Sequence, residues 1–139
     1  MDVVARHLAA IDRLRTLDLR EGGAGYRTVA LETSQGLGAG DAGARGRAAE
    51  DFHALREAIA ARLDARWGGG PAWGQLTLRV RLARGESIPE PWAALCLRTD
   101  ELDVWQAGED GAWVALGVAD RDADDEVELL AAVTWTAPP

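Results

Sequence analysis

The stretch ELDVWQAGEDGAWVALGVADRD, residues 101–122, decides the fold because an Asp-Gly pair separates its two apolar runs. This arrangement predicts a β-hairpin, since a type I′ turn needs a positive φ that glycine tolerates. A two-residue turn at Asp110–Gly111 puts Trp105 on one face with Val114 and turns Trp113 to the opposite face. A slip of one residue brings both tryptophans to one side. We expect Trp105 in the core and Trp113 either as a surface contact or under a helix or loop.

Two stretches before the hairpin have the apolar spacing of amphipathic helices. One covers about residues 2–18, and the other begins after Gly46 and ends at the GGGP that follows Trp67. Between them, YRTVALET predicts a short strand with Val29 and Leu31 on one face. The apolar positions of the two helices are Val4, Leu8, Ile11 and Leu14, then Phe52, Leu55, Ile59 and Leu63.

Alternating residues predict strands around the hairpin. In QLTLRVRLAR, residues 75–84, every second side chain is apolar, and WAALCLRT at 92–99 is interpreted as another strand. The segment 126–135 fits a strand or a helix, and its Val-Thr-Trp-Thr ending favours a strand. The predicted fold class is therefore α+β, with two helices packed on one face of a mainly antiparallel four- to five-stranded meander. Residues 1–139 form one predicted domain.

Composition narrows the functional classes. The 139 residues carry a formal charge of −8, which argues against nucleic-acid binding and favours solubility or a basic partner. No apolar run approaches the roughly 20 residues that a membrane helix needs, so we expect no membrane association. The chain has a single cysteine, which gives no disulfide framework, and we expect a cytoplasmic protein.

The glycine-rich loop 34–46 contains GAGDAG, which matches the G-x-G-x-x-G pattern through Gly38, Gly40 and Gly43. Such a loop lets bare backbone approach a pyrophosphate at the start of a helix. Here the motif is separated from both the strand and the helix, and no second βαβ unit follows. The three glycines remain a candidate ligand site against the alternative of an ordinary loop. A Walker A loop is excluded because the chain has no lysine.

The acidic run DRDADDEVE, 120–128, begins like a calcium loop, with Asp120, Asp122 and Asp124 at alternate positions. The sixth position is Asp125 where glycine is needed, and the twelfth is Ala131 where a bidentate glutamate is needed. A weak cation site and a solvated acidic turn both remain open. We assign no metal ligand and no cofactor.

No catalytic constellation is visible. Cys96 lies in an apolar run and is expected to be a small buried hydrophobe. His7 and His53 fall on different predicted helices, and no Cys or His pair has metal-ligand spacing. We assign no catalytic residue and favour a protein that is not an enzyme.

Arg79 and Arg81 form, with Thr77, the outward row of the alternating segment. This basic strip on an acidic chain could hold an acidic patch of a partner, a phosphate, or the chain's own carboxylates. Cross-strand pairs of opposite charge favour the last. Arg79, Arg81 and Trp113 are the predicted interaction residues.

The C-terminal half, from ARWG onward, resembles a group of small bacterial proteins from high-GC genomes that have no assigned activity. The shared marks are Trp67-Gly68, PEPW at 89–92, WVALGV at 113–118 and LLAAVT at 129–134. The resemblance implies an independently folded domain and no particular chemistry.

These observations favour a non-catalytic protein-binding domain, for example an immunity- or antitoxin-type inhibitor of a basic partner. The alternative is a small-ligand or nucleotide-binding protein, or an enzyme, that uses the loop 34–46. A homodimer joined across the sheet is a third hypothesis.

Overall fold

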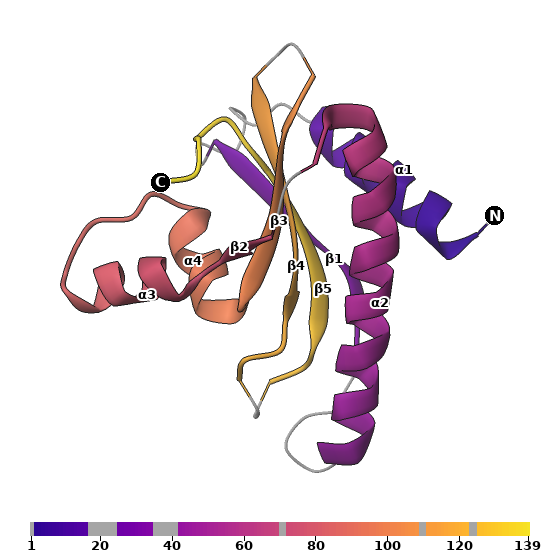
Figure 1. Cartoon of the computed structure of the whole chain (residues 1–139), viewed down its shortest axis with the longest axis horizontal. Helices are drawn as coiled ribbons and strands as arrows, with labels where there is room; N and C mark the ends of the chain where they lie inside the picture. The colour runs from indigo at the N-terminus through magenta and orange to yellow at the C-terminus, as the bar shows by residue number, and fades with distance from the viewer. Residues whose placement is uncertain (1, 17–24, 35–41, 70–71, 109–110, 123–124) are drawn as a thin grey trace.

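A five-stranded antiparallel sheet organises the computed structural model, which describes residues 2–16, 25–34, 42–69, 72–108, 111–122 and 125–139. The meander β3-β4-β5 forms its centre, and the earlier strands β1 and β2 are added at its two edges (Figure 1). The spatial order is β1-β5-β4-β3-β2, and every neighbouring pair is antiparallel. The strands are β1 (Tyr26–Thr33), β2 (Trp73–Gly74), β3 (Glu101–Ala107), β4 (Ala112–Ala119) and β5 (Glu128–Thr134).

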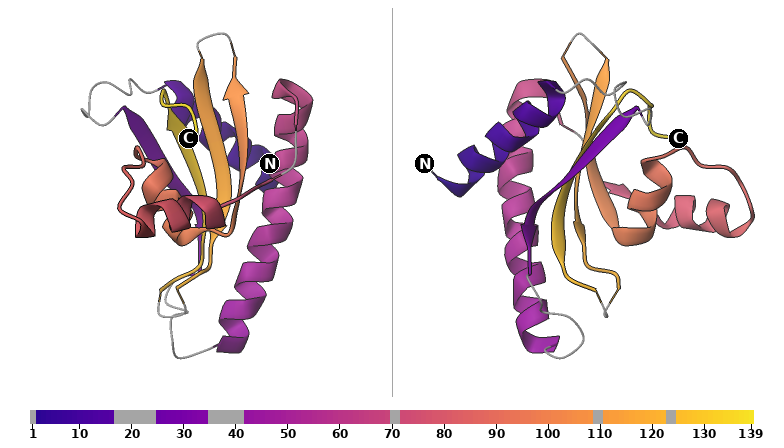
Figure 2. Two further views of the ribbon diagram at one scale, coloured as in Figure 1. Left: turned by 60° about the vertical axis from the view of Figure 1, so that its left-hand side comes forward. Right: turned by 180° about the vertical axis from the view of Figure 1, so that it is seen from behind.

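Helices lie on both sides of this sheet. The helices α1 (Val3–Thr16) and α2 (Ala42–Trp67) pack on one face, which confirms the predicted α+β class. Two further helices, α3 (Leu76–Ala83) and α4 (Trp92–Arg98), lie on the opposite side (Figures 1 and 2). The N-terminus is on the α1 side and the C-terminus on the α3–α4 side.

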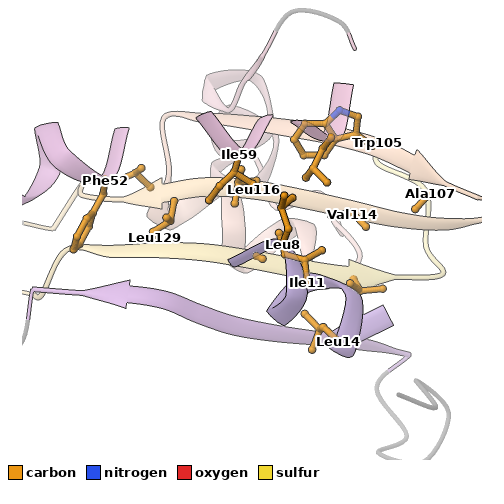
Figure 3. Packing of buried hydrophobic residues seen from close by; sticks show 14 of the residues in the cluster. Leu8, Ile11, Leu14, Phe52, Ile59, Trp105, Ala107, Val114, Leu116 and Leu129 are labelled. Carbon is orange, nitrogen blue, oxygen red and sulfur yellow. The ribbon is translucent and has the colours of Figure 1, made fainter. Parts of the chain in front are cut away.

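The first core lies between α1, α2 and the sheet. Apolar residues recur every three or four positions in both helices, so that each helix buries one stripe, as predicted. Figure 3 shows these side chains pointing onto the strands that carry Val114, Leu116 and Leu129. The buried members are Leu8, Ile11 and Leu14 in α1 and Phe52, Ile59 and Leu63 in α2.

The hairpin of β3 and β4 has the predicted faces with a longer loop. Trp105 pairs with Val114, whereas a two-residue turn would pair it with Leu116. The difference is two residues, so every side chain keeps its face. Trp105 is buried in the first core, and Trp113 points to the opposite side. Gly111 has a φ of 79°, and Asp110 lies outside the described residues.

The ambiguous segment near the C-terminus is a strand, as predicted. β5 is the central partner of both β1 and β4, and Val127, Leu129, Ala131 and Val133 belong to the first core. Alternate residues of β5 face the two helical layers, which explains why its interior residues, 129–133, are all apolar.

The prediction of a strand over residues 75–84 is wrong, because Leu76–Ala83 forms the helix α3. Residues two apart in a helix are about 200° apart around its axis, so the alternating apolar side chains divide between two sides. Leu78 and Leu82 pack against the apolar cluster on this side of the sheet. Leu76 and Val80 point away from it and are exposed.

The prediction of a strand over 92–99 is also wrong, because Trp92–Arg98 forms α4. Trp92, Leu95 and Cys96 are buried at the three- and four-residue spacing of a helix. Together with Leu102 of β3 and Leu130 of β5, α4 forms the second apolar cluster. The sheet is therefore covered on both faces, and its central strands are buried on both.

Two leucines of α3 distinguish the helix from the predicted strand. Replacing Leu78 by alanine should lower the free energy of unfolding by about 1–2 kcal/mol, because Leu78 is half-buried against the second cluster. Replacing Leu76 should change it by less than about 0.5 kcal/mol, because its side chain is largely in water. Urea titrations of both variants measure the difference. Equal costs would indicate that both leucines share one face, as in a strand.

Candidate functional site

The β2–α3 segment exposes an apolar surface that its sequence pattern makes unavoidable. Once an alternating pattern is wound into a helix, one half of its apolar side chains cannot face the core. The outward half is Leu76, which is 65% exposed, and Val80, which is 40% exposed. Trp73 in β2, just before the helix, is 44% exposed. We call Trp73, Leu76 and Val80 the α3 surface.

The α3 surface is a concentration of exposed apolar side chains rather than a scattering. In the described part of the chain, the large hydrophobic residues that are exposed are Val3, Trp73, Leu76, Val80, Leu97 and Trp135. Three of these six lie within eight consecutive residues. Single exposed apolar residues are ordinary, whereas exposed apolar residues that gather on one part of a surface are a feature of many interaction sites.

The two arginines of α3 point in different directions. Arg79 is largely buried, and its Nη1 donates hydrogen bonds to the carbonyl oxygens of Cys96 at 3.0 Å and Thr99 at 2.9 Å. These carbonyls belong to the C-terminal end of α4, where backbone acceptors lack helical partners. Arg81 is more exposed and forms an ion pair with Glu86 at 3.3 Å. Arg79 therefore ties α3 to α4, while Arg81 lies nearer to solvent.

Cys96 is buried, as predicted, although it lies on the helix α4 and not on a strand. Its Sγ donates to the carbonyl oxygen of Ala93 at 3.1 Å. Burial raises the pKa of the thiol above the usual 9.0, and the positive charge of Arg79 opposes this shift. The thiol is consequently protonated at neutral pH, which is the unreactive form.

We expect Cys96 to react with a disulfide reagent at least about 100-fold more slowly in the native protein than in urea. Because the pKa in the fold is raised, the neutral thiol contributes stability that is present below pH 9.0 and is lost as the pH rises through the raised value. Urea titrations between pH 7 and 11 measure this loss of stability. In Cys96→Ala, the part of the loss that comes from ionisation of the thiol should be absent. Equal labelling rates in the two states would contradict the burial.

Trp113 lies on the α3–α4 side of the sheet. It is half-buried and packs against the second cluster together with Val104, Leu78 and Leu82. The indole is thus partly under the helical layer, which is the predicted alternative to a surface contact.

Only one of the three candidate glycines lies in the described chain. Gly38 and Gly40 fall outside the described residues. Gly43 is in the first turn of α2, which begins at Ala42 rather than after Gly46 as expected. Gly43 is therefore helical, and α2 begins five residues earlier than predicted.

The acidic segment after β4 already contacts a cation, the guanidinium of Arg45. This side chain donates to the carbonyl oxygens of Asp120 at 3.3 Å, Asp122 at 2.6 Å and Asp125 at 3.2 Å. Asp124 lies outside the described residues. Where the chain is described, no group of three or more His, Cys, Asp or Glu side chains is placed to hold a metal ion.

Both histidines pair with a carboxylate from another element. His7 is buried on α1, with its Nε2 3.0 Å from Oε1 of Glu32 in β1. His53 of α2 is half-exposed, with its Nε2 2.9 Å from Oδ2 of Asp120. The two pairs join different parts of the fold. The first links α1 to β1, and the second links α2 to the loop after β4.

A third pair, Arg56 and Asp103, lies largely buried between α2 and β3. The Nε of Arg56 is 3.2 Å from Oδ2 of Asp103, and Nη2 is 3.5 Å from Oε2 of the more exposed Glu101. Burial raises the pKa of Asp103 above its usual 3.8, although Arg56 lowers it. Buried carboxyls with raised pKa values occur at functional sites, but also in structural ion pairs such as this one.

Replacing Asp103 by asparagine should raise the free energy of unfolding at pH 7. The pKa of Asp103 is raised in the fold, so the protonated carboxyl group is the form that the fold favours. Its contribution to stability is present below pH 3.8 and is lost as the pH rises through the raised value. The difference in free energy of unfolding between Asp103→Asn and the wild type should become smaller as the pH falls toward 3.8. Urea titrations from pH 4 to 7 test this, with Glu101→Gln as a control expected to stay within about 0.5 kcal/mol. A less stable Asp103→Asn protein at pH 7 would show that the ion pair outweighs the burial.

Comparisons with protein-family models, with curated proteins and with solved structures gave no match. In the described chain, no helix combines the length and the apolar character needed to cross a membrane.

Arg79 and Arg81 were predicted on the outward face of a strand, but they lie on the helix α3, where Arg79 is largely buried. The exposed apolar residues beside them were not predicted. Trp73, Leu76 and Val80 were assigned to the core or left without a role, because a strand would bury the two aliphatic side chains. The signal that could have revealed them is Gly85, which follows the helix with a φ of 84°. A glycine after Leu-Ala-Arg is typical of a helix C-terminus.

Proposed function

We propose that this chain is a non-catalytic protein-binding domain that contacts its partner through the α3 surface. The observation that carries the proposal is the group of exposed apolar side chains formed by Leu76 and Val80 of the short helix α3 and Trp73 of β2, which precedes it. Burying such side chains against a partner removes apolar area from water, and tryptophan is enriched among residues that dominate binding energy.

Local charge supports a partner with acidic groups around its apolar contact. The helix α3 contains Arg79 and Arg81 and no acidic residue, and the exposed Arg84 follows it. The net charge of −8 led to the expectation of a basic partner, as for an immunity- or antitoxin-type inhibitor. Net charge affects the rate of diffusional encounter, whereas the charges around the apolar contact determine which groups of a partner fit opposite them. We therefore propose acidic groups opposite Arg81 and Arg84 in the contact itself.

A double charge substitution tests the surface. Leu76→Glu with Val80→Glu places two carboxylates on the exposed row and should weaken partner binding at least about 100-fold. The stability of the variant should stay within about 0.5 kcal/mol, since both side chains are exposed. Ala54→Glu with Ala58→Glu is the matched control, because these exposed residues of α2 have the same four-residue spacing.

The measurement is affinity capture from a lysate of the cells that encode the protein, with light scattering of the purified variants. A protein captured by the wild type and the α2 control but not by the α3 variant supports the proposal. Dimers that become monomers only in the α3 variant would identify the partner as a second copy. Identical capture and identical mass for all three proteins would contradict the proposal.

A further inference from the structure

The strand β1 is one edge of the sheet, and within the described chain no strand pairs with its outer side (Figure 2). It is eight residues long, with the sequence YRTVALET, and contains no proline. An unpaired edge presents free N–H and C=O groups to which another strand can bind, and proteins that keep such an edge single often place a proline there. The outer side of β1 is therefore a place where a further strand can extend the sheet.

The contact of β1 with β5 determines which backbone groups point outward. The carbonyl oxygen of Gly25, just before β1, accepts a hydrogen bond from the N–H of Trp135 at 3.4 Å, so Gly25 directs its polar groups toward β5. In an antiparallel pair, successive residues direct these groups alternately toward and away from the partner strand. Tyr26, Thr28 and Ala30 therefore direct their N–H and C=O groups outward. The side chains of Thr28 and Ala30 are also exposed.

Two opposite charges of β1, Arg27 and Glu32, lie on the same face of the sheet. The bulge after Ala30 adds one residue to the strand, and this shift brings Glu32 to the face of Arg27 and Val29. Each of these three is opposite a residue of the first core in β5; the partners are, in order along β1, Val133, Ala131 and Leu129. Four ladder positions separate the two charges, which is about 13 Å, so they do not pair within one strand.

Both charged groups have unused bonding capacity. Arg27 is half-buried, its Nε has no hydrogen-bond partner, and no carboxylate of the described chain lies within ion-pair distance of its guanidinium. Glu32 contacts Nε2 of His7 at 3.0 Å and Nη2 of Arg6 at 3.3 Å, and both contacts are to Oε1. A carboxylate accepts through both of its oxygens, so Oε2 of Glu32 can take a further cation without loss of the first two contacts.

We propose that two copies of this chain pair through β1 as antiparallel strands, with Val29 of one copy opposite Val29 of the other. Thr28 of each copy is then opposite Ala30 of the other, and their outward N–H and C=O groups exchange hydrogen bonds. Arg27 of each copy lies beside Glu32 of the other, so the symmetric contact contains this charge pair twice. A register centred on Thr28 or on Ala30 does not bring these charges together, and charge complementarity therefore selects the register centred on Val29.

This interface is separate from the α3 surface. The helix α3 follows β2, which is the opposite edge strand of the sheet. The double variant Leu76→Glu with Val80→Glu should therefore leave the β1 dimer unchanged, so the failure of one proposal is distinguishable from the failure of the other.

A proline substitution tests the strand pairing itself. Light scattering of a dilution series should show the wild type approaching twice the monomer mass of 14.8 kDa. The Kd should be on the order of 10–100 μM, as for a small contact. Thr28→Pro removes an N–H that points away from β5, so the ladder between β1 and β5 stays intact, and the dimer should weaken at least about tenfold. Thr28→Ala is the matched control and should stay within about twofold of the wild type.

A charge exchange tests the register. Arg27→Glu and Glu32→Arg each put like charges together at both pairs and should each weaken the dimer about 10- to 100-fold. An equimolar mixture of the two variants puts opposite charges together at both pairs, so it should form heterodimers with a Kd close to that of the wild type. Thr28→Pro and Arg27→Glu remain decisive if Glu32→Arg fails to fold.

Three results would overturn the proposal. One is a wild type that keeps the monomer mass at concentrations up to about 1 mM. Another is a dimer that is equally stable in Thr28→Pro or in Arg27→Glu. The third is a dimer that dissociates in the variant Leu76→Glu with Val80→Glu, because this would place the contact between copies on the α3 surface.

Discussion

Replacing Trp105 by alanine should lower the free energy of unfolding by about 3–5 kcal/mol. Trp105 is 4% exposed in the first core, and its indole lies 6.4 Å from that of Trp67 at an angle of 57°. Its Nε1 also donates to Oδ1 of Asp64 at 2.8 Å. Alanine removes the ring, its contact with α2 and the hydrogen bond together. Urea titration followed by circular dichroism measures the change.

Trp135 provides the matched control for Trp105. It follows β5 and is 44% exposed, so Trp135→Ala should change the stability by less than about 0.5 kcal/mol. Trp105→Phe should recover part of the loss, because a phenyl ring refills most of the space without the N–H. A loss of less than about 1 kcal/mol in Trp105→Ala would mean that Trp105 is not the core tryptophan of the hairpin.

The success of the sequence in placing Trp105 has a simple physical basis. Side chains alternate strictly along a strand, so one turn signal at Asp110–Gly111 fixes the face of every residue in both strands. The turn is longer than two residues, but an error of two leaves the faces unchanged. The helices α1 and α2 were predictable for a similar reason, since each has one continuous apolar stripe and a charged remainder.

The segment around α3 was mispredicted because its pattern is compatible with two structures. Alternate apolar residues suit a half-buried strand, and they also suit a helix with one buried and one exposed apolar side. If every leucine is assumed to be buried, the pattern predicts a strand, because only a strand puts all of them on one face. The helix is favoured by local propensity, because leucine, arginine and alanine form helices well, and by the positive φ of Gly85 at its end. The exposure of Leu76 is thus both the source of the error and the evidence for an interaction surface.

Residues 92–99 were mispredicted as a strand although the start of α4 carries a helix signal. Pro91 is the N-cap residue of α4, and a proline at the beginning of an apolar segment with two alanines favours a helix over an interior strand. The role of Arg45 could not be predicted from the sequence, because it depends on the carbonyl oxygens that the fold brings together after β4.

Replacing Arg79 by methionine should lower the free energy of unfolding by about 2–3 kcal/mol. The sequence placed Arg79 on an outward face, but its guanidinium reaches the carbonyl oxygens of Cys96 and Thr99 at the end of α4. Methionine preserves the apolar stem and removes the charged donors, so two carbonyl groups lose their hydrogen bonds. The contact between α3 and α4 should loosen while α1 and α2 remain packed on the other face. Urea titration measures the cost, and amide hydrogen exchange should show faster exchange in α4 than in α2.

Arg81 and Arg84 allow the same substitution to be compared along one segment. Arg81→Met removes a partly exposed ion pair with Glu86 and should cost less than about 1 kcal/mol. Arg84→Met, at an exposed position, should cost less than about 0.5 kcal/mol. The expected order of cost is therefore Arg79 well above Arg81 and Arg84, which follows from burial of the donor rather than from its charge. Three equal costs would mean that Arg79 is a surface residue like the others, and the assignment of α3 as a helix bound to the end of α4 would then be wrong.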